Sequence, residues 1–226
     1  MGIRSDEKGV RRFRYYLFDL DGTINDSGPG IMKSVQYALD RMGYPKQPEE
    51  LLRKFVGPSL MDSFSSLFQM SEEQAEEAVR LYRENYVQNK ALYDLEVYDG
   101  MRETLRKLKE NGSFLAIVTS KPHSITDLVV DHFELRQYFD YITGPELSDP
   151  SSDKSKLIRR AMEALGAVPE ETVMTGDTRY DVEGAAACGI ASCGVTYGYG
   201  TLEELEEAGA DFLADKPEDI LKLKNR

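Results

Sequence analysis

Residues 13–23, FRYYLFDLDGT, contain an apolar run that ends abruptly in two aspartates, Asp19 and Asp21. Gly22 and Thr23 follow directly. A short apolar run that ends at a glycine turn is typical of a buried strand that opens into a loop. Open α/β sheets place their ligand sites at the carboxyl ends of strands. The stretch therefore predicts a first strand over residues 15–18 with two carboxylates at a candidate ligand site.

These two carboxylates carry like charges, which repel unless a cation or a proton lies between them. Mg²⁺ prefers oxygen ligands, and a spare carboxylate can act as a nucleophile. A calcium loop is one alternative, but Gly22 comes too early for it and an apolar strand precedes instead of a helix. A solvated turn with incidental acids is the other alternative. The leading hypothesis is a Mg²⁺ site with a carboxylate nucleophile.

The composition is ordinary for a folded globular protein: 226 residues, 41% hydrophobic and 30% charged. A formal net charge of −12 argues against nucleic acid or an anionic membrane as partner, because both favour a basic surface. A small anionic substrate stays compatible, since a bound cation and one or two lysines reverse the field inside a cleft. We find no signal-length segment at the N-terminus and no run near the roughly 18 apolar residues of a membrane span. We expect a cytoplasmic protein, as a monomer or a homodimer.

Hydrophobic periodicity changes along the chain. Residues 29–95 are predicted to form a series of amphipathic helices, one of them with a capping box of Ser71 and Gln74. From residue 97 onward, short apolar runs alternate with helical segments, which indicates a parallel sheet covered on both faces. The predicted fold is α/β: a doubly wound, Rossmann-like core of residues 1–28 and 96–226, with residues 29–95 inserted as an all-helical cap. Such a cap would lie above the carboxyl edge of the sheet as a lid.

Polar side chains recur at the carboxyl ends of later predicted strands. Thr119 and Ser120 end one run, where hydroxyl and backbone N–H groups can hold phosphate oxygens, although such residues are also ordinary helix caps. Asp177 ends another run, with Asp181 four residues later. Either acid could simply favour a helix N-terminus. Acids after two separate buried strands nevertheless favour a shared metal ion.

A lysine also stands at a helix start. Lys154 lies in the first turn of a predicted helix, where the helix dipole slightly disfavours a cation, which makes it a candidate for a functional role. Lys156 is the competing candidate, and a solvated helix face is the alternative for both.

The order of FDLDGT, VTSK, Lys154 and GDTRYD resembles the haloacid dehalogenase superfamily, in its large phosphatase branch. These motifs and the cap span nearly the whole chain. The resemblance implies that Asp19 is a nucleophile that forms an aspartyl-phosphate. It implies that Asp21 protonates the leaving group and then activates water. The dehalogenase branch lacks this second aspartate, so carbon–halogen hydrolysis is not expected.

The resemblance also implies a set of binding residues. Thr119 and Lys154 are the expected phosphoryl-binding pair, and Thr23 and Ser120 are expected to contact the substrate. The implied cofactor is Mg²⁺, held by Asp19, by Asp21 through its backbone carbonyl, and by Asp177, with Asp181 in support nearby.

Substrate choice is expected to lie in the cap. Residues 52–59, LRKFVGPS, resemble the cap loop of phosphoglycolate phosphatases, which carry an Arg and a Gly at the positions of Arg53 and Gly57. Pro58 and Ser59 depart from that loop, and FVGP is similar to related phosphatases whose substrates are nucleotides or are not known. The implied function is a Mg²⁺-dependent phosphatase of a small phosphorylated metabolite, phosphoglycolate-like or nucleotide. A solvated helix end is the alternative for Arg53.

Three other functions are weighed against this one. A phosphosugar mutase of the β-phosphoglucomutase type shares the core, but we see no match to its cap residues. A non-catalytic phosphoryl-binding protein or switch, such as a receiver domain, would be smaller and would not need Asp21. A phosphonate-cleaving relative would need a Schiff-base lysine in the cap, for which Lys33 and Lys54 are the candidates.

Overall fold

The apolar run ahead of Asp19 forms a central strand. In the computed structural model, which describes residues 13–146 and 153–224, β1 covers Tyr15–Phe18. It pairs in parallel with β4 (Phe114–Val118) on one side and with β6 (Thr172–Gly176) on the other. Further parallel pairings complete the sheet in the order β5-β4-β1-β6-β7-β8, where the outer strands are β5 (Tyr141–Thr143), β7 (Ala191–Val195) and β8 (Phe212–Ala214).

Successive residues of β1 point to opposite faces of this sheet. Leu17 belongs to a core cluster beneath α7 (Lys154–Leu165) and α8 (Arg179–Cys188). Tyr16 and Phe18 belong to a larger cluster on the other face, which includes residues of α5 (Met101–Glu110), α6 (His123–His132) and the 3-10 helix Pro217–Lys222. The sheet is thus covered on both faces, and the predicted doubly wound α/β fold is confirmed.

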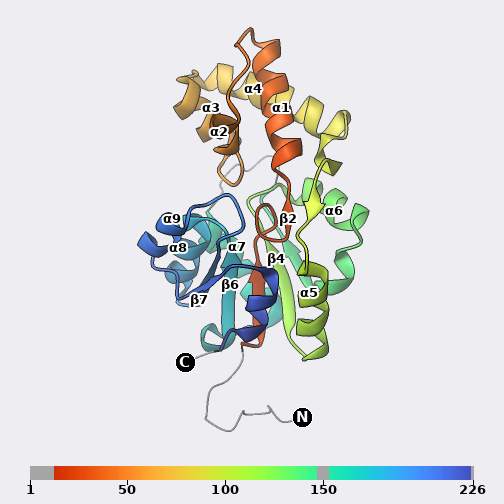
Figure 1. Cartoon of the computed structure of the whole chain (residues 1–226), viewed down its shortest axis with the longest axis vertical. Coiled ribbons are helices and arrows are strands. Elements are labelled where there is room, and N and C mark those ends of the chain that lie inside the picture. Colours follow the sequence, from red (N-terminus) through yellow and green to blue (C-terminus); the bar gives the residue numbers. More distant parts are fainter. Residues whose placement is uncertain (1–12, 147–152, 225–226) are drawn as a thin grey trace.

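The helical insertion lies between β1 and β4. Its helices are α1 (Gly28–Arg41), α2 (Glu49–Arg53), α3 (Leu60–Phe68) and α4 (Glu72–Arg83), and they stand as a cap at one end of the sheet (Figure 1). The predicted capping box of Ser71 and Gln74 begins α4. After α4 the chain continues through a π-helical turn, Glu84–Gln88, and a 3-10 turn, Ala91–Tyr93. The insertion is present, while its predicted boundaries at residues 29 and 95 stay a proposal.

Two short strands join cap and core. β2 (Asn25–Asp26) leads into α1, and β3 (Glu96–Val97) leaves the cap; they pair in an antiparallel ladder. Neither this ladder nor β8 was predicted from the sequence; β2 and β3 have two residues each, too few to show a periodicity. The chain therefore enters and leaves the cap through one paired hinge.

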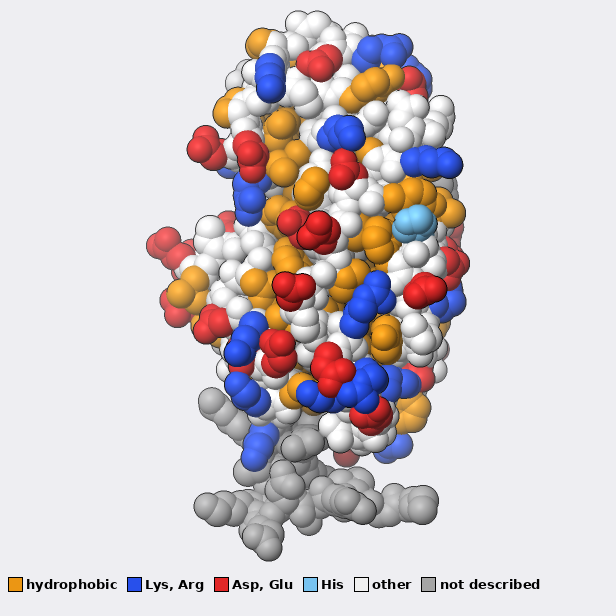
Figure 2. Space-filling model, turned by 45° about the vertical axis from the view of Figure 1, so that its right-hand side comes forward, with side chains coloured by type: hydrophobic (Ala, Val, Ile, Leu, Met, Phe, Trp, Pro, Cys, Tyr) orange, Lys and Arg blue, Asp and Glu red, His pale blue; other side chains and the backbone are white. Residues whose placement is uncertain are grey.

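Figure 2 shows acidic and basic side chains interspersed over one face of the molecule. Within the described ranges, no helix has the length and apolar character needed to cross a membrane. The expectation of no signal sequence concerns the N-terminal segment, and residues 1–12 lie outside the described part of the chain.

Candidate active site

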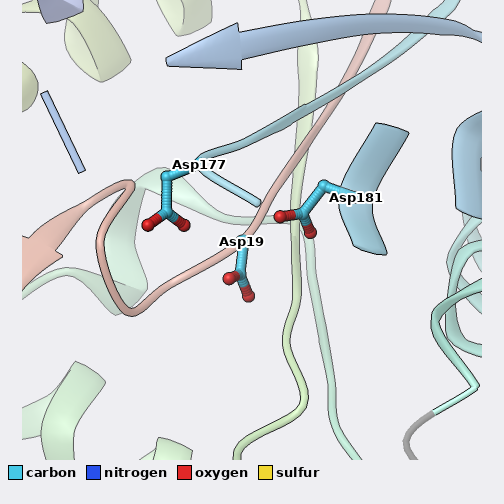
Figure 3. Close-up of side chains that lie close together, drawn as sticks. All are labelled: Asp19, Asp177 and Asp181. Carbon is cyan, nitrogen blue, oxygen red and sulfur yellow. The ribbon is translucent and has the colours of Figure 1, made fainter. Parts of the chain in front are cut away.

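Three buried carboxylates meet at the carboxyl edge of the sheet. Asp19 follows β1, Asp177 follows the neighbouring strand β6, and Asp181 lies in the first turn of α8. Each offers one oxygen atom, and these oxygens lie within 4.8 Å of one another. Figure 3 shows the three side chains turned toward a common space. The structure thus brings together the acids that the sequence placed after two separate strands.

Backbone and hydroxyl donors fix two of these acids. The Asp177 carboxylate accepts a hydrogen bond from the backbone N–H of Tyr199 at 2.8 Å and one from the Thr23 hydroxyl at 3.4 Å. Asp181 accepts from the backbone N–H and the hydroxyl of Thr178 at 3.2 and 2.9 Å at the start of α8. Thr23 therefore faces the carboxylate cluster and helps to orient Asp177.

One lysine reaches the cluster. The Nζ atom of Lys154 lies 2.9 Å from Asp19 Oδ1 and 2.8 Å from Asp181 Oδ1, and it donates a hydrogen bond to the Val118 carbonyl at 3.1 Å. The side chain of Lys154 is only 5% exposed, whereas that of Lys156 is 68% exposed. Of the two candidate lysines, only Lys154 contacts the carboxylates.

Negative charge exceeds positive charge in this cluster. Burial raises the pKa of Asp19 to about 6, even though the Lys154 ammonium lowers it. Burial also raises the pKa of Asp177 well above its usual range, and the neighbouring carboxylates add to the effect. For Lys154, burial alone would lower the pKa, but the Asp181 and Asp19 carboxylates outweigh it and hold the pKa above the usual value.

The oxygen atoms of the three carboxylates are suitable ligands for a divalent cation. Within the described residues, Asp19 Oδ1 and Asp181 Oδ1 are buried without a well-aligned hydrogen bond, although both lie within ion-pair distance of Lys154. Carboxylate oxygens are the ligands of hard ions such as Mg²⁺. The buried acids are therefore consistent with a metal site.

The Asp21 side chain faces the cap instead. Its Oδ1 atom lies 2.7 Å from the Nζ atom of Lys121, which also donates a hydrogen bond to the Tyr86 hydroxyl at 2.7 Å. Gly22 follows with a φ of +85°, and a Cβ there would lie 2.1 Å from Asp177 Oδ2. Glycine thus lets this loop approach Asp177, and the Asp21 side chain lies outside the carboxylate cluster. The predicted metal contact through the Asp21 backbone carbonyl stays a prediction.

A cavity opens beside Asp19 and Asp21, between core and cap. Its core side includes Thr119, Ser120 and Lys121. The cap contributes mainly apolar and aromatic side chains, with one arginine: Ile31, Phe55, Leu60, Met61, Val79, Tyr82, Arg83 and Tyr86. This arrangement can hold a phosphoryl group at the carboxylates and an organic group against the cap.

The two predicted cap residues differ in position. Gly57 lines the cavity with a φ of +102°, and a Cβ there would lie 3.3 Å from Thr178 Cγ2, so the cap loop closely approaches the core. Arg53 is absent from the described cavity lining, and its guanidinium lies 4.9 Å from the ring centre of Tyr199. The structure therefore offers no contact that supports the predicted substrate role of Arg53.

Three residues around the site were not predicted from the sequence. Lys121 directly follows Ser120 at the end of β4, so the same strand-end argument could have found it. Tyr199 lies in the loop TYGYG after β7, where a Cβ on Gly198 would lie 2.3 Å from Asp177 Cβ. Its alternating glycines were an available signal for close backbone approach. Tyr86 gave no such signal.

Similarity to known proteins shows the family of this chain. The model of the haloacid dehalogenase-like hydrolases matches residues 16–195, and the chain belongs to that family. It is a haloacid dehalogenase-like hydrolase of the phosphoglycolate phosphatase-like branch, with the helical cap after the first strand. The resemblance drawn from the motifs is confirmed.

Individual relatives cover most of the chain. A 5′-nucleotidase of Pseudomonas aeruginosa is 38% identical over 194 residues, which cover 86% of this chain and 87% of that protein. Phosphoglycolate phosphatase 1 of the same species is 31% identical over 215 residues, covering 92% of this chain and 78% of the relative. A crystal structure of a predicted phosphatase from Clostridium acetobutylicum has a TM-score of 0.87 at 41% identity, over 94% of this chain and 100% of that one.

Mg²⁺ is expected to raise the melting temperature of the substrate-free protein at pH 7.5. A ligand that binds only the folded state stabilises it, by about 2.7 kcal/mol at a concentration 100 times its Kd. Asp177→Asn replaces one charged candidate metal ligand with a neutral amide and should weaken the Mg²⁺ affinity at least about tenfold. Differential scanning calorimetry with a Mg²⁺ titration measures this directly. Glu183→Gln, at an exposed acid of α8 that pairs with Arg179, is the matched control and should keep the full gain.

The gain should also depend on pH. The pKa of Asp19 is about 6 in the folded protein against 3.8 in the unfolded reference, so the folded state binds more protons between those values. The metal-free protein therefore loses stability from this group as pH rises from about 4 through 6. Protons compete with the cation in that range, so the Mg²⁺ gain should be smaller at pH 5 than at pH 7.5. The metal site would be contradicted if Mg²⁺ raised the melting temperature equally at both pH values. It would also be contradicted if Mg²⁺ raised the melting temperature of Asp177→Asn as much as that of the wild type.

Proposed function

We propose that this protein is a Mg²⁺-dependent phosphatase that hydrolyses a small phosphorylated metabolite through an aspartyl-phosphate on Asp19. The observation that carries the proposal is the position of Asp19. It lies in the buried cluster with Asp177, Asp181 and Lys154, and it also lines the cavity beside Asp21. Asp19 thus contacts a charge-balancing lysine on one side and, on the other, lines a cavity together with a second carboxylate. The names of the relatives support the same reaction class.

The first half of the proposed reaction transfers the phosphoryl group to the protein. An Asp19 oxygen attacks phosphorus as the bond from phosphorus to the leaving oxygen breaks, and Asp21 gives that oxygen a proton. Thr119 and Lys154 bind phosphoryl oxygens, with Ser120 at the cavity wall. A bound divalent cation would offset the repulsion between the Asp19 carboxylate and the phosphate dianion.

The second half releases phosphate. Asp21, now a carboxylate, takes a proton from water, and the water oxygen attacks phosphorus. The bond from phosphorus to Asp19 breaks, which returns the Asp19 carboxylate and leaves the proton on Asp21 for the next cycle. One aspartate can serve both halves because its protonation state alternates.

The cap favours a substrate with an apolar or aromatic part. Its cavity wall is formed largely by aliphatic and aromatic residues, including the stacked pair Tyr82 and Tyr86 with ring centres 5.1 Å apart. Such a wall suits a nucleoside better than the carboxymethyl group of phosphoglycolate. The name of the P. aeruginosa 5′-nucleotidase agrees with this preference. We propose a nucleoside monophosphate as the first substrate to test.

Arg83 is the cap cation best placed to recognise a second anionic group. It lines the cavity, and among the described residues it has no ion-pair partner. Arg83→Met is expected to raise the KM for phosphoglycolate about tenfold, because a hydrogen bond to a charged group contributes about 1.5–3 kcal/mol. The KM for p-nitrophenyl phosphate, which has no second anion, should change less than about threefold. Arg53→Met is the control, since Arg53 lies outside the described lining, and equal effects of the two variants would refute this assignment.

The alternatives find no support in the cavity. Lys33 is 64% exposed and pairs with Asp94 at 3.1 Å, and neither it nor Lys54 is found in the described lining, so no contact supports a Schiff-base role. The mutase and the non-catalytic phosphoryl-binding role stay predictions without a favouring contact. The cytoplasmic location and the monomeric or homodimeric state stay predictions as well.

The proposal is tested by phosphate release with and without Mg²⁺, using Asp19→Asn as the blank. The panel contains nucleoside monophosphates, phosphoglycolate, sugar phosphates and pyrophosphate. Mg²⁺-dependent release that the blank lacks would support the phosphatase, and the highest kcat/KM would identify its substrate class. No release from any compound would overturn the proposal in favour of an isomerising or binding role.

A further inference from the structure

A buried lysine joins the candidate acid/base to the cap. Lys121 stands after β4, and its Nζ atom lies 2.7 Å from Asp21 Oδ1 in the core and 2.7 Å from the Tyr86 hydroxyl in the cap. All three side chains are buried, and all three line the cavity. The Tyr86 ring lies 5.1 Å from the same ammonium. One cation therefore contacts both sides of the site at once.

Holding the cap against the core does not require this charge. Other contacts already cross between the two parts, including the Arg53 guanidinium of the cap, which lies 4.9 Å from the ring centre of Tyr199 in the core. Burying an ammonium and a carboxylate costs solvation, and apolar residues of similar size could connect the two parts at least as well. The reason for a buried ammonium at this point must therefore lie in the group that it contacts, the Asp21 carboxylate.

Local structure on both sides fixes the lysine. The backbone N–H of Lys121 donates to the Thr119 hydroxyl at 3.1 Å, which holds the start of the loop. On the cap side, Tyr86 lies in the π-helical turn Glu84–Gln88, an irregularity often found at functional sites. Tyr82 stacks on the Tyr86 ring, with an angle of 24° between the ring planes. The tyrosine hydroxyl thus meets Lys121 from a buried side chain that packs against Tyr82.

The hydroxyl is also a constant partner. Burial raises the pKa of the Tyr86 phenol well above its usual value, so the hydroxyl stays neutral and can accept from the ammonium across the working pH range. With its Tyr86 partner in place, Lys121 has one orientation toward Asp21. Without that partner, the long lysine side chain regains rotational freedom.

We infer that Lys121 and Tyr86 are positioning residues for Asp21, and that they fix its carboxyl group only when the cap is seated on the core. The inference rests on the proposed role of Asp21 as proton donor and acceptor. It implies that proton transfer is coupled to cap closure: a phosphate bound under an open cap meets an Asp21 that is not held in place. Neither residue needs to touch the reacting atoms for this effect.

Leaving groups that differ in basicity provide the test. When the bond from phosphorus to the leaving oxygen breaks, phenolate needs the proton from Asp21, whereas the less basic p-nitrophenolate leaves without it. Single-turnover release of the phenol, with enzyme in excess, reports this first step alone. Tyr86→Phe is expected to lower the second-order rate constant about tenfold for phenyl phosphate and less than about twofold for p-nitrophenyl phosphate. Lys121→Met should show the same selectivity with a larger loss, and Lys121→Arg should restore part of it.

A double-mutant cycle shows whether Tyr86 acts through Asp21. In an Asp21→Asn background, Tyr86→Phe should have no further effect on phenyl phosphate, because the group that it positions is gone. Tyr37→Phe is the matched control: the Tyr37 hydroxyl donates to Glu84 Oε1 at 2.5 Å on the same π-helical turn, but Tyr37 does not line the described cavity. That variant should leave both rate constants within about twofold.

The outcomes separate this inference from the proposed function. Equal losses for both phenyl esters, or a full Tyr86→Phe effect in the Asp21→Asn background, would mean that Tyr86 supports the fold or the substrate, and the inference would be wrong while the phosphatase stands. Absence of Mg²⁺-dependent hydrolysis by the wild-type protein would overturn the proposed function and the inference with it. Selective loss on phenyl phosphate that vanishes in the cycle would establish the positioning role.

Discussion

Asp19→Asn is expected to lower the turnover of every substrate by at least about a thousandfold while the protein stays folded. A neutral amide cannot form the bond to phosphorus, but it matches the carboxylate in shape. The pKa of Asp19 is raised to about 6 by burial, so at pH 7.5 the folded protein holds a carboxylate at a cost in solvation. The amide avoids that cost. The metal-free variant should therefore melt at the same temperature as the wild type or above it.

Phosphate release and thermal unfolding, measured on the same preparations, test both parts. Asp215→Asn is the matched control, because Asp215 also follows a strand, β8 at the edge of the sheet, and accepts from the Thr196 hydroxyl at 2.7 Å outside the carboxylate cluster. It should retain near-full turnover. Substantial turnover in Asp19→Asn would end the assignment of Asp19 as nucleophile. A large drop in melting temperature would instead show that the Asp19 charge stabilises the fold.

The acids of the site could be predicted because their positions follow from local sequence. An apolar run and a glycine turn place Asp19 at the end of a strand, and the same pattern places Asp177. Parallel strands then bring their carboxyl ends to one edge, so the two side chains meet without any further information. The doubly wound core followed from the same alternation of short apolar runs and amphipathic helices.

The lysines required the three-dimensional structure. Lys154 and Lys156 lie two residues apart on one helix, and only the packing of α7 against the sheet distinguishes the buried side chain from the exposed one. Lys121 lies 100 residues from its partner Asp21, and 35 from Tyr86. No periodicity specifies a contact over that distance, and the π-helical turn that presents Tyr86 interrupts the regular helical pattern.

The cap residues show the same limit. Gly57 was predicted from its place in a loop, and its positive φ and cavity position agree with a close approach. Arg53 was selected by the same resemblance but stacks on Tyr199, while Arg83, from the end of α4, lines the cavity. Which arginine faces the substrate depends on how α2 and α4 pack over the core, and that packing is not encoded within either helix.

Lys154→Met is expected to have the largest effect on stability. The variant keeps the length of the side chain but leaves Asp19 and Asp181 buried without their cation. Removal of one partner from a buried ion pair costs about 3–5 kcal/mol, because the remaining charge is uncompensated. Turnover should fall at least about a hundredfold, since the proposed nucleophile loses the cation that balances its charge. Urea unfolding of the metal-free protein and phosphate release measure the two effects.

The pH dependence of Lys154→Met identifies the cause. Without the ammonium, the pKa of Asp19 should rise above its present value of about 6, because Lys154 now lowers it. Asp19 then stays protonated to a higher pH in the folded variant than in the unfolded chain. The loss of stability relative to the wild type should therefore be small at pH 5 and large at pH 7.5. Saturating Mg²⁺ should recover part of the loss at pH 7.5, since it supplies the missing positive charge. The matched control is Lys156→Met, at a side chain that is 68% exposed, and its free energy of unfolding should stay within about 0.5 kcal/mol of the wild type. A loss of stability that does not depend on pH would point to poor packing of the methionine. Equal effects of the two variants would contradict the assignment of Lys154 as the lysine that balances the carboxylates.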